Sequence, residues 1–354
     1  MKFPCERRTA IGAGVVAAAL LLPQQGMAGG TIKIDDTKWV SVGAGLRTSF
    51  TSVEDGAISG DDDNDFNLES VRLYLNGQIH KYLKLEFNTD YDGANDVNVL
   101  DAVAKVEFND YLNVWMGRHL PPSDRANLDG PYYLNNWNFP FVQAYPAIFA
   151  GRDNGIMLNG QVDGGRFKYA LGAYEGNDDF AGTGSNPDDK LLYAARFSYS
   201  FLDPEPGFYT SSTYYGSKDI FTVAVALQSQ KDGTGFAATP GDFFGWSVDV
   251  LYEKPIGNGG AFSLEGAYYD YDHDEVPAFG YDGDGYYALA SYLTQKEYGF
   301  GRLQPHVRYL DLSSDTDDLP AASAFFVPDL DMWEAGLGYI IDGHNARATL
   351  TFGE

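Results

Sequence analysis

The sequence predicts an all-β protein, a transmembrane, antiparallel, up-and-down β-barrel of about 16 strands. The first observation is alternation: residues 221–228 place Phe, Val, Val and Leu on one face and Thr, Ala, Ala and Gln on the other. Successive side chains of a strand point to opposite faces, so such a segment has one apolar and one polar wall. A soluble sandwich would alternate in the same way. An export signal and a rhythm of connection lengths favour a barrel in lipid.

The first 28 residues have the pattern of a secretory signal peptide. Lys2, Arg7 and Arg8 form a basic region, residues 10–22 are apolar, and residues 26–28 are small enough for cleavage. We therefore expect a signal peptide at 1–28, a barrel domain at 29–354 and a location in the bacterial outer membrane. The single cysteine, Cys5, lies in the signal, so the mature barrel should hold no disulfide.

Composition agrees with a barrel. After the signal, no run approaches the roughly 18 apolar residues of a membrane helix, which leaves a closed barrel as the way to cross lipid. Mean hydropathy is −0.29, as expected when one face of every strand is wet. Aromatic residues make up 15% of the chain, with 25 Tyr and 23 Phe, and these fit girdles at the two membrane interfaces.

Strand candidates were located by alternation between turn residues, and about fifteen segments qualify. They are residues 39–50, 68–79, 83–91, 97–108, 112–120, 155–162, 167–175, 191–201, 220–230, 243–253, 261–271, 285–293, 303–312, 332–341 and 346–352.

The connections between these segments alternate in length. Short ones lie at residues 80–82, 109–111, 163–165 and 342–345, whereas most odd-numbered segments are followed by longer, acidic or glycine-rich stretches. Outer-membrane barrels have short periplasmic turns and long external loops, so we expect the first strand to run outward. Residues 202–219 are an exception, a long connection on the periplasmic side.

The strand count leaves a problem at the end of the chain. Bacterial single-chain barrels have an even number of strands, because an unpaired edge is unstable in lipid. Either residues 31–34 add a short strand, or the protein continues past Glu354 with one more strand that ends in an aromatic residue. We favour the second alternative. Residues 346–352 should then lie beside a gap or pair directly with residues 40–50.

The longest connection, residues 121–154, is the best functional candidate. A loop of this length is usually functional or disordered. Trp137, Phe139, Phe141, Tyr145 and Phe149 argue against disorder, because these rings need a surface to bury against. The segment either folds inward and narrows the lumen, which we favour, or packs outside over the rim.

Charged residues on the polar face of each strand, opposite the apolar face, should point into the lumen. There, rings of charged side chains set the ion preference of a pore. The parity set also includes acidic and imidazole groups, namely Glu86, Glu107, Asp249, Glu265 and His306. These charges either contact ions or pair across strands. Together with the long connection, the cationic pore-lining candidates are Arg47, Arg72, Lys84, Lys105, Arg118, Arg125, Arg152, Lys168, Arg196, Arg308 and Arg347.

The chain is strongly acidic. It has 24 Lys and Arg against 50 Asp and Glu, a net charge of −26, which becomes −28 without the signal peptide. Nucleic acid is excluded as a partner, because the basic footprint for it is missing. Much of the acid lies in predicted loops and is interpreted as a solvated surface. Divalent-cation binding is the alternative, from the alternate aspartates of residues 61–65 and 270–274, although neither run completes an EF-hand loop.

No motif for catalysis or for a cofactor is present. The five histidines lack metal-ligand spacing, and no nucleophile elbow, P-loop or dinucleotide-binding turn occurs. We expect no enzyme, no cofactor and no resident metal.

Several segments resemble the bacterial phosphate-selective porin O and P family. They are residues 68–77, 112–125, 152–160, 303–309 and 343–348, which span most of the mature chain. The resemblance implies a sixteen-stranded, usually trimeric barrel with a loop folded into the pore, and lumenal arginines and lysines where phosphate is preferred. Arg47, Arg72 and Arg118 are the positions that match this role.

The expected function is therefore an outer-membrane porin, a homotrimeric passive diffusion channel for small hydrophilic solutes and ions, surrounded by outer-membrane lipid. An oxyanion-selective, phosphate-type channel is the alternative within that class. A second class is the barrel sheath of an electron-transfer conduit, which would need separate cytochromes and a wide lumen. A third is a soluble secreted sandwich, which would need two packed sheets.

Overall fold

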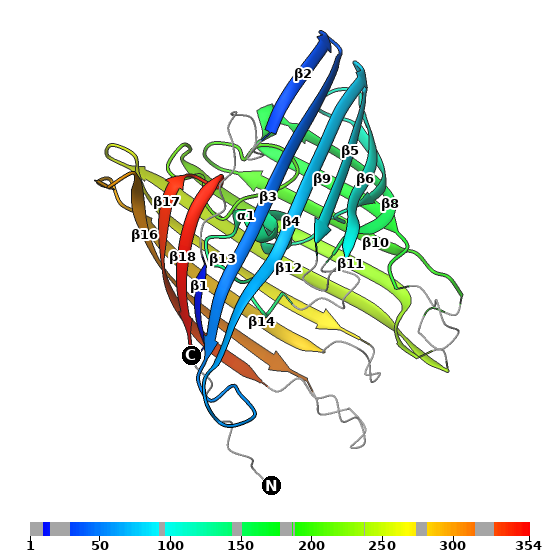
Figure 1. The fold of residues 1–354 in the computed structure, drawn as a ribbon. Coiled ribbons are helices and arrows are strands. Elements are labelled where there is room, and N and C mark those ends of the chain that lie inside the picture. Colours follow the sequence, from blue (N-terminus) through cyan, green and yellow to red (C-terminus); the bar gives the residue numbers. More distant parts are fainter. Residues whose placement is uncertain are drawn as a thin grey trace.

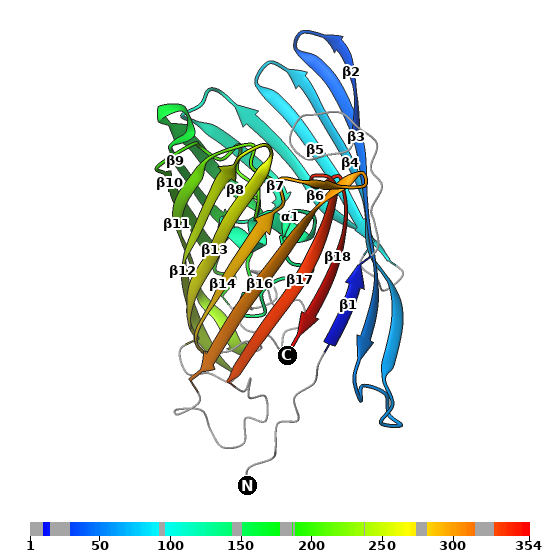
Figure 2. The same ribbon diagram turned by 90° about the vertical axis from the view of Figure 1, so that its left-hand side faces the viewer.

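In the computed structural model, one antiparallel sheet curls into a barrel (Figures 1 and 2). The structure describes residues 10–14, 29–91, 96–143, 151–177, 186, 188–236, 238–273, 282–315 and 329–354, with backbone alone at 10–14 and 236. The strands are β1 Ala10–Gly14, β2 Gly29–Asp35, β3 Lys38–Val53, β4 Asp63–His80, β5 Leu83–Tyr91, β6 Val97–Glu107, β7 Asn113–His119, β8 Asp153–Val162, β9 Phe167–Tyr174, β10 Leu192–Ser200, β11 Ile220–Phe236, β12 Thr239–Ile256, β13 Gly260–Asp272, β14 Gly283–Leu293, β15 Glu297–Tyr298, β16 Gly301–Ser314, β17 Leu330–Asp342 and β18 Ala346–Gly353. The described helices are α1 Arg125–Tyr133 and a 3-10 turn, η1 Asp163–Gly165.

The strand pairings close into a ring. From β3 to β14 each strand pairs with the next, then β14 with β16, β16 with β17 and β17 with β18. β1 joins β18 to β3. Of the 18 described strands, β2 and β15 each extend only one neighbour, which leaves 16 in the ring. All fifteen predicted segments form strands of this ring, and a two-sheet sandwich is excluded.

The sixteenth place in the ring lies between β18 and β3. β1 occupies it, with Ala10–Gly14 opposite Gly353–Thr349 on one side and Val53–Ser49 on the other. In the full chain the expected gap beside residues 346–352, or their direct pairing with residues 40–50, is therefore wrong, and the strand that fills this place belongs to the predicted signal peptide, residues 1–28. Residues 31–34 do form a strand, β2, but β2 pairs with the start of β3 and lies outside the ring. The sequence between β1 and β2 is outside the described residues.

The outer face of the barrel is apolar. On β4, Val71, Leu73 and Leu75 are 40–48% exposed, whereas Arg72 between them is 9% exposed and faces inward. This agrees with the predicted parity, and such an apolar face is typical of barrels that lie in lipid. No helix in the described part of the chain is long and apolar enough to span a membrane.

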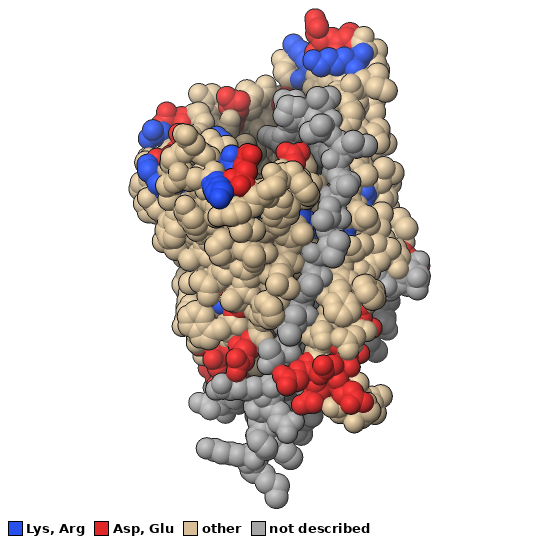
Figure 3. Space-filling view, turned by 60° about the vertical axis from the view of Figure 1, so that its left-hand side comes forward, with Lys and Arg blue, Asp and Glu red and all other residues tan. Residues whose placement is uncertain are grey.

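Charge differs between the two ends of the barrel (Figure 3). Asp and Glu side chains gather at the lower end in that view, and both signs mix at the upper end. The lower end carries the long connection between β3 and β4, with Asp61, Asp62 and Asp63 exposed, and the upper end carries the short turns. The short turns and the long acidic loops that alternate along the sequence thus lie at opposite ends of one barrel.

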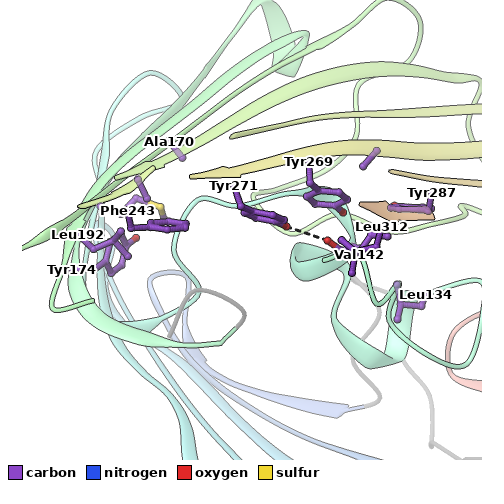
Figure 4. Close-up of a cluster of buried hydrophobic side chains, with 14 of the residues drawn as sticks. Leu134, Val142, Ala170, Tyr174, Leu192, Phe243, Tyr269, Tyr271, Tyr287 and Leu312 are labelled. Atoms are coloured by element: carbon purple, nitrogen blue, oxygen red, sulfur yellow. Dashed lines mark hydrogen bonds between the residues drawn. The ribbon is translucent and has the colours of Figure 1, made fainter. Parts of the chain in front are cut away.

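The interior of the barrel contains a hydrophobic core, which the predicted parity did not anticipate. Tyr269 and Tyr271 of β13, Tyr287 of β14 and Phe243 of β12 are 0–3% exposed on the lumenal side. Figure 4 shows Tyr269, Tyr271 and Tyr287 near Val142 of the long connection after β7, whereas Phe243 lies beside Leu192 and Tyr174. The wall from β9 to β16 buries these rings because a chain segment covers it, as the next section describes.

Candidate functional site

The long connection after β7 folds into the barrel. We call its described part, residues 120–143, the inserted segment; its remaining residues 144–150, with Tyr145 and Phe149, are outside the described residues. It contains α1, which begins after Asp124, whose carboxylate accepts from the Asn127 amide at 3.3 Å and caps the helix. Gly130 interrupts α1 with φ of 59°, a left-handed conformation that glycine adopts without strain, and Pro131 follows. The inward alternative therefore holds for the described part.

One end of the inserted segment is bound to the wall formed by β10 to β13. The Arg196 guanidinium donates to the Ser123 carbonyl at 2.8 Å, and the Tyr269 hydroxyl donates to the Asp124 carboxylate at 2.8 Å. Gln228 donates to the Pro122 carbonyl at 3.0 Å. The chain thus turns inward along hydrogen bonds that the wall supplies.

The other end reaches the wall formed by β16, β18 and β3. Arg47 donates to the Trp137 carbonyl at 2.8 Å and Arg308 donates to the Asn138 carbonyl at 2.9 Å. Arg347 donates to the carbonyl of Leu134. Three predicted lumenal arginines therefore hold backbone carbonyls, and the inserted segment crosses the lumen from wall to wall.

A second segment enters the lumen from the opposite end. We call residues 202–219, between β10 and β11, the inner connection. The Arg125 guanidinium makes a bidentate ion pair with Glu205, at 2.8 and 2.7 Å. The Ser212 amide donates to the Tyr133 carbonyl at 3.1 Å. The inserted segment and the inner connection therefore meet inside the barrel.

The inner connection is fixed to the wall by further polar contacts. The Glu253 carboxylate of β12 accepts from the Thr213 hydroxyl at 2.7 Å and the Tyr214 amide at 2.9 Å. His344, in the turn before β18, lies 2.8 Å from the Ser211 hydroxyl through Nε2. Burial lowers the pKa of His344 to about 3, and the charge of Arg347 acts in the same direction, so this imidazole is neutral at ordinary pH.

A buried ionic cluster joins the two segments to the wall. Arg125 and Asp249 are both 0% exposed, and Arg196 of β10 binds Asp249 of β12 through two hydrogen bonds of 2.5 and 2.9 Å. Burial by itself would raise the pKa of Glu205, but the charge and hydrogen bonds of Arg125 outweigh burial and lower it to about 2. Glu205 is therefore ionised, and Arg125 has the partners that a buried cation needs.

Asp124 differs from Glu205, because its pKa is raised and not lowered. Burial raises the pKa of Asp124 to about 6, although the hydrogen bond from Tyr269 opposes the shift. Asp249 adds a like charge nearby. Burial and the Glu265 carboxyl also raise the pKa of Asp129, on the next turn of α1, well above its usual range. The helix thus carries carboxyl groups that favour their neutral form.

On the wall from β3 to β7, the predicted cations pair with carboxylates one by one. Arg72 binds Asp90 at 2.7 Å, and Arg47 lies 3.4 Å from Glu69. Among the remaining candidates, the pairs near this wall are Lys84 with Glu107, Lys105 with Glu86 and Arg152 with Asp101 at 3.1 Å. Elsewhere in the barrel, Arg308 of β16 pairs with Glu334 of β17 at 2.5 Å. Of the two alternatives for these charges, cross-strand pairing describes most of them.

Two candidates are bound in another way. Lys168 donates to the carbonyls of Glu205 and of Gly207, the latter at 2.7 Å, and so supports the inner connection. Arg118 is placed wrongly by the sequence: it shares the outer face of β7 with Met116, which is 64% exposed, and donates to the Val99 carbonyl at 3.3 Å. Arg118 entered the candidates through the family resemblance and was not part of the set given by alternation, which places it on the same face of β7 as Met116.

The inner connection is the part of the site that sequence reasoning missed. Two signals in the sequence were available. The inner connection is long for the periplasmic side, and it carries four aromatic rings, at Phe208, Tyr209, Tyr214 and Tyr215. The lumenal tyrosines were overlooked because they were assigned to membrane girdles. Among the described residues, no three His, Cys, Asp or Glu side chains are grouped to hold a metal ion. Part of the run 270–274 lies outside the described residues.

No family model matches the chain. A curated protein of Aquifex aeolicus (strain VF5), described as uncharacterized, is 26% identical over 282 residues, which are 70% of this chain and 66% of that protein. The match thus spans slightly less than two thirds of the relative's length.

The solved structures that resemble the chain are bacterial outer-membrane proteins. A loop-deletion mutant of OmpT, an outer membrane protein of Vibrio cholerae, has a TM-score of 0.51 and 12% identity over 90% of this chain and 98% of its own. Salmonella typhi OmpF has a TM-score of 0.46 at 12% identity, covering 98% and 96%. An anion-selective porin from Comamonas acidovorans has 0.42 at 14% identity, covering 89% and 98%. At such identities the likeness is one of fold alone, a β-barrel.

Proposed function

We propose that the protein is an outer-membrane porin, a passive diffusion channel for small hydrophilic solutes and ions. The observation that carries the proposal is a single antiparallel sheet curled into a barrel with an apolar outer face, whose lumen carries paired charges and is narrowed by a segment that crosses it. An apolar outer face fits lipid, and charged groups inside fit water and ions. The outer-membrane location and a homotrimeric assembly belong to the same proposal. So does cleavage of residues 1–28, which would remove β1 from its place between β18 and β3.

The oxyanion-selective alternative has less support. It needs cationic groups that are free to meet an anion, but Arg72, Arg125, Arg196 and Arg308 each bind a carboxylate. A paired guanidinium presents little net charge to a passing ion. The electron-transfer sheath also has less support, because threaded cytochromes would collide with the inserted segment. We therefore favour a channel with weak ion preference.

Planar-bilayer recording tests the proposal. Purified protein should need detergent, migrate differently on gels when unheated, and give discrete conductance steps whose reversal potentials in salt gradients report the ion preference. Replacing residues 132–141 by a short Gly-Ser linker should raise the single-channel conductance, because the narrowest part of a channel sets its resistance. A folded wild-type protein that inserts without conductance steps would contradict the channel. Equal conductance of wild type and linker variant would place the narrowest part elsewhere.

A further inference from the structure

The same three-part arrangement recurs on the wall formed by β3 to β7. In each case a lumenal cation has a carboxylate on one side and an aromatic ring over it. The Arg47 guanidinium carbon lies 4.1 Å from the centre of the Trp137 ring, with Glu69 as its carboxylate. The Lys105 ammonium lies 3.7 Å from the centre of the Trp115 ring, with Glu86 as its carboxylate.

The third case again uses a ring from the inserted segment. The Arg72 guanidinium carbon lies 5.1 Å from the centre of the Tyr132 ring and binds Asp90. Ser70 connects Asp90 to Tyr132, because its hydroxyl donates to Asp90 at 2.6 Å and lies 3.0 Å from the Tyr132 hydroxyl. Gly45 on β3 makes room: a Cβ there would lie 3.0 Å from the Tyr132 ring.

The rings are held by their own hydrogen bonds. The Trp137 indole donates to Glu69 at 3.0 Å, so this carboxylate serves both the cation and the ring above it. The side chains of Arg47 and Arg72 are only 11% and 10% exposed as a result. Among the described residues, Nε of Arg47 is buried without a hydrogen-bond partner. An N–H donor that could bind an anion is thus present but covered.

We infer that Trp137 and Tyr132 determine the ion preference of the channel by covering Arg47 and Arg72. This inference rests on the proposed channel function. A cation under a ring is shielded from an approaching anion by the ring itself, and the neutralising carboxylate removes the long-range attraction. The inserted segment therefore supplies two shielding rings to the lumen. Removing the Trp137 and Tyr132 rings exposes N–H donors of Arg47 and Arg72 that an anion can reach.

The test compares two variants of the full chain in planar bilayers under a potassium chloride gradient. Trp137→Leu with Tyr132→Leu removes both rings. Phe139→Leu is the matched control, because Phe139 is an exposed ring of the same segment whose side chain covers no described cation. The double variant should raise the ratio of anion to cation permeability by about fivefold, the factor that corresponds to roughly 1 kcal/mol of lost cation–π shielding. The control should keep the wild-type reversal potential.

Adding Arg47→Gln and Arg72→Gln to the double variant identifies the source of the shift. If the exposed arginines cause it, the fourfold variant should lose the gain in anion permeability. A double variant that conducts more but keeps the control's reversal potential would overturn the inference, and so would a shift that survives removal of both arginines. Heat-dependent migration of every variant verifies that the barrel has formed. Folded proteins without any conductance, wild type included, would instead overturn the channel and this inference with it.

Discussion

The inserted segment meets the barrel differently at its two ends. At the first end, Arg125 is 0% exposed and is bound by Glu205 and Asp249 within a hydrophobic core. At the second end, Trp137 and Tyr132 lie on arginines that keep about a tenth of their surface exposed. The first end uses buried charge and the second uses rings over charge. The comparison teaches that the first end is held by buried ion pairs, while the second end would lie beside the solute path of the proposed channel.

The largest effect is expected from Arg125. Replacing it by Met leaves the carboxylates of Glu205 and Asp249 buried without this cation, a situation that typically costs about 3–5 kcal/mol. We expect Arg125→Met to release the inserted segment, with noisy, larger conductance and a lower unfolding temperature in detergent. Arg47→Met at the second end is the matched comparison and should change stability far less. Equal decreases in unfolding temperature for the two variants would contradict the distinction between the two ends.

Acid should strengthen the first end. Burial raises the pKa of Asp124 from 3.8 to about 6, so between these values the folded state binds more protons than the unfolded one. The stability of the seated segment therefore falls as pH rises through this window, by up to about 3 kcal/mol for two pKa units. Glu205, with a pKa of about 2, stays ionised throughout.

Conductance at pH 5 and pH 7 measures this effect. We expect lower conductance at pH 5, when Asp124 is neutral beside Tyr269, Asp249 and Arg196. Asp124→Asn keeps the helix cap and imitates the neutral acid, so its conductance should be low at both pH values. A variant that retains the full wild-type pH response would assign that response to another group.

The smallest effect is expected at the second end. Arg72→Gln leaves Asp90 without its cation, so the lumen gains one negative charge and reversal potentials should move toward cations. The change in ion energy should be about 1 kcal/mol, the interaction of two unit charges 4 Å apart in bulk water. Arg118→Gln is the control, because Arg118 lies on the outer face and should cause no shift. A shift with Arg118→Gln and none with Arg72→Gln would reverse the assignment of faces.

Much of the fold followed from the sequence. The fifteen predicted segments are strands, and Val71, Leu73 and Leu75 face outward as the parity requires. Less of the site followed. Charged residues were assigned correctly to the lumen at Arg47 and Arg72, but the carboxylate and the ring that accompany each arginine could not be identified. Those partners come from other strands and from a segment about 60 to 90 residues away.

The sequence by itself determined the strands, the two faces of the barrel and the presence of a long, aromatic connection after β7. These features depend on a two-residue period and on local composition, which any stretch of chain carries alone. Tertiary structure decided that residues 202–219 enter the lumen, that Arg125 meets Glu205, and that β1 occupies the place between β18 and β3. Such contacts depend on strand register and on closure of the ring, which bring together residues that no local pattern relates.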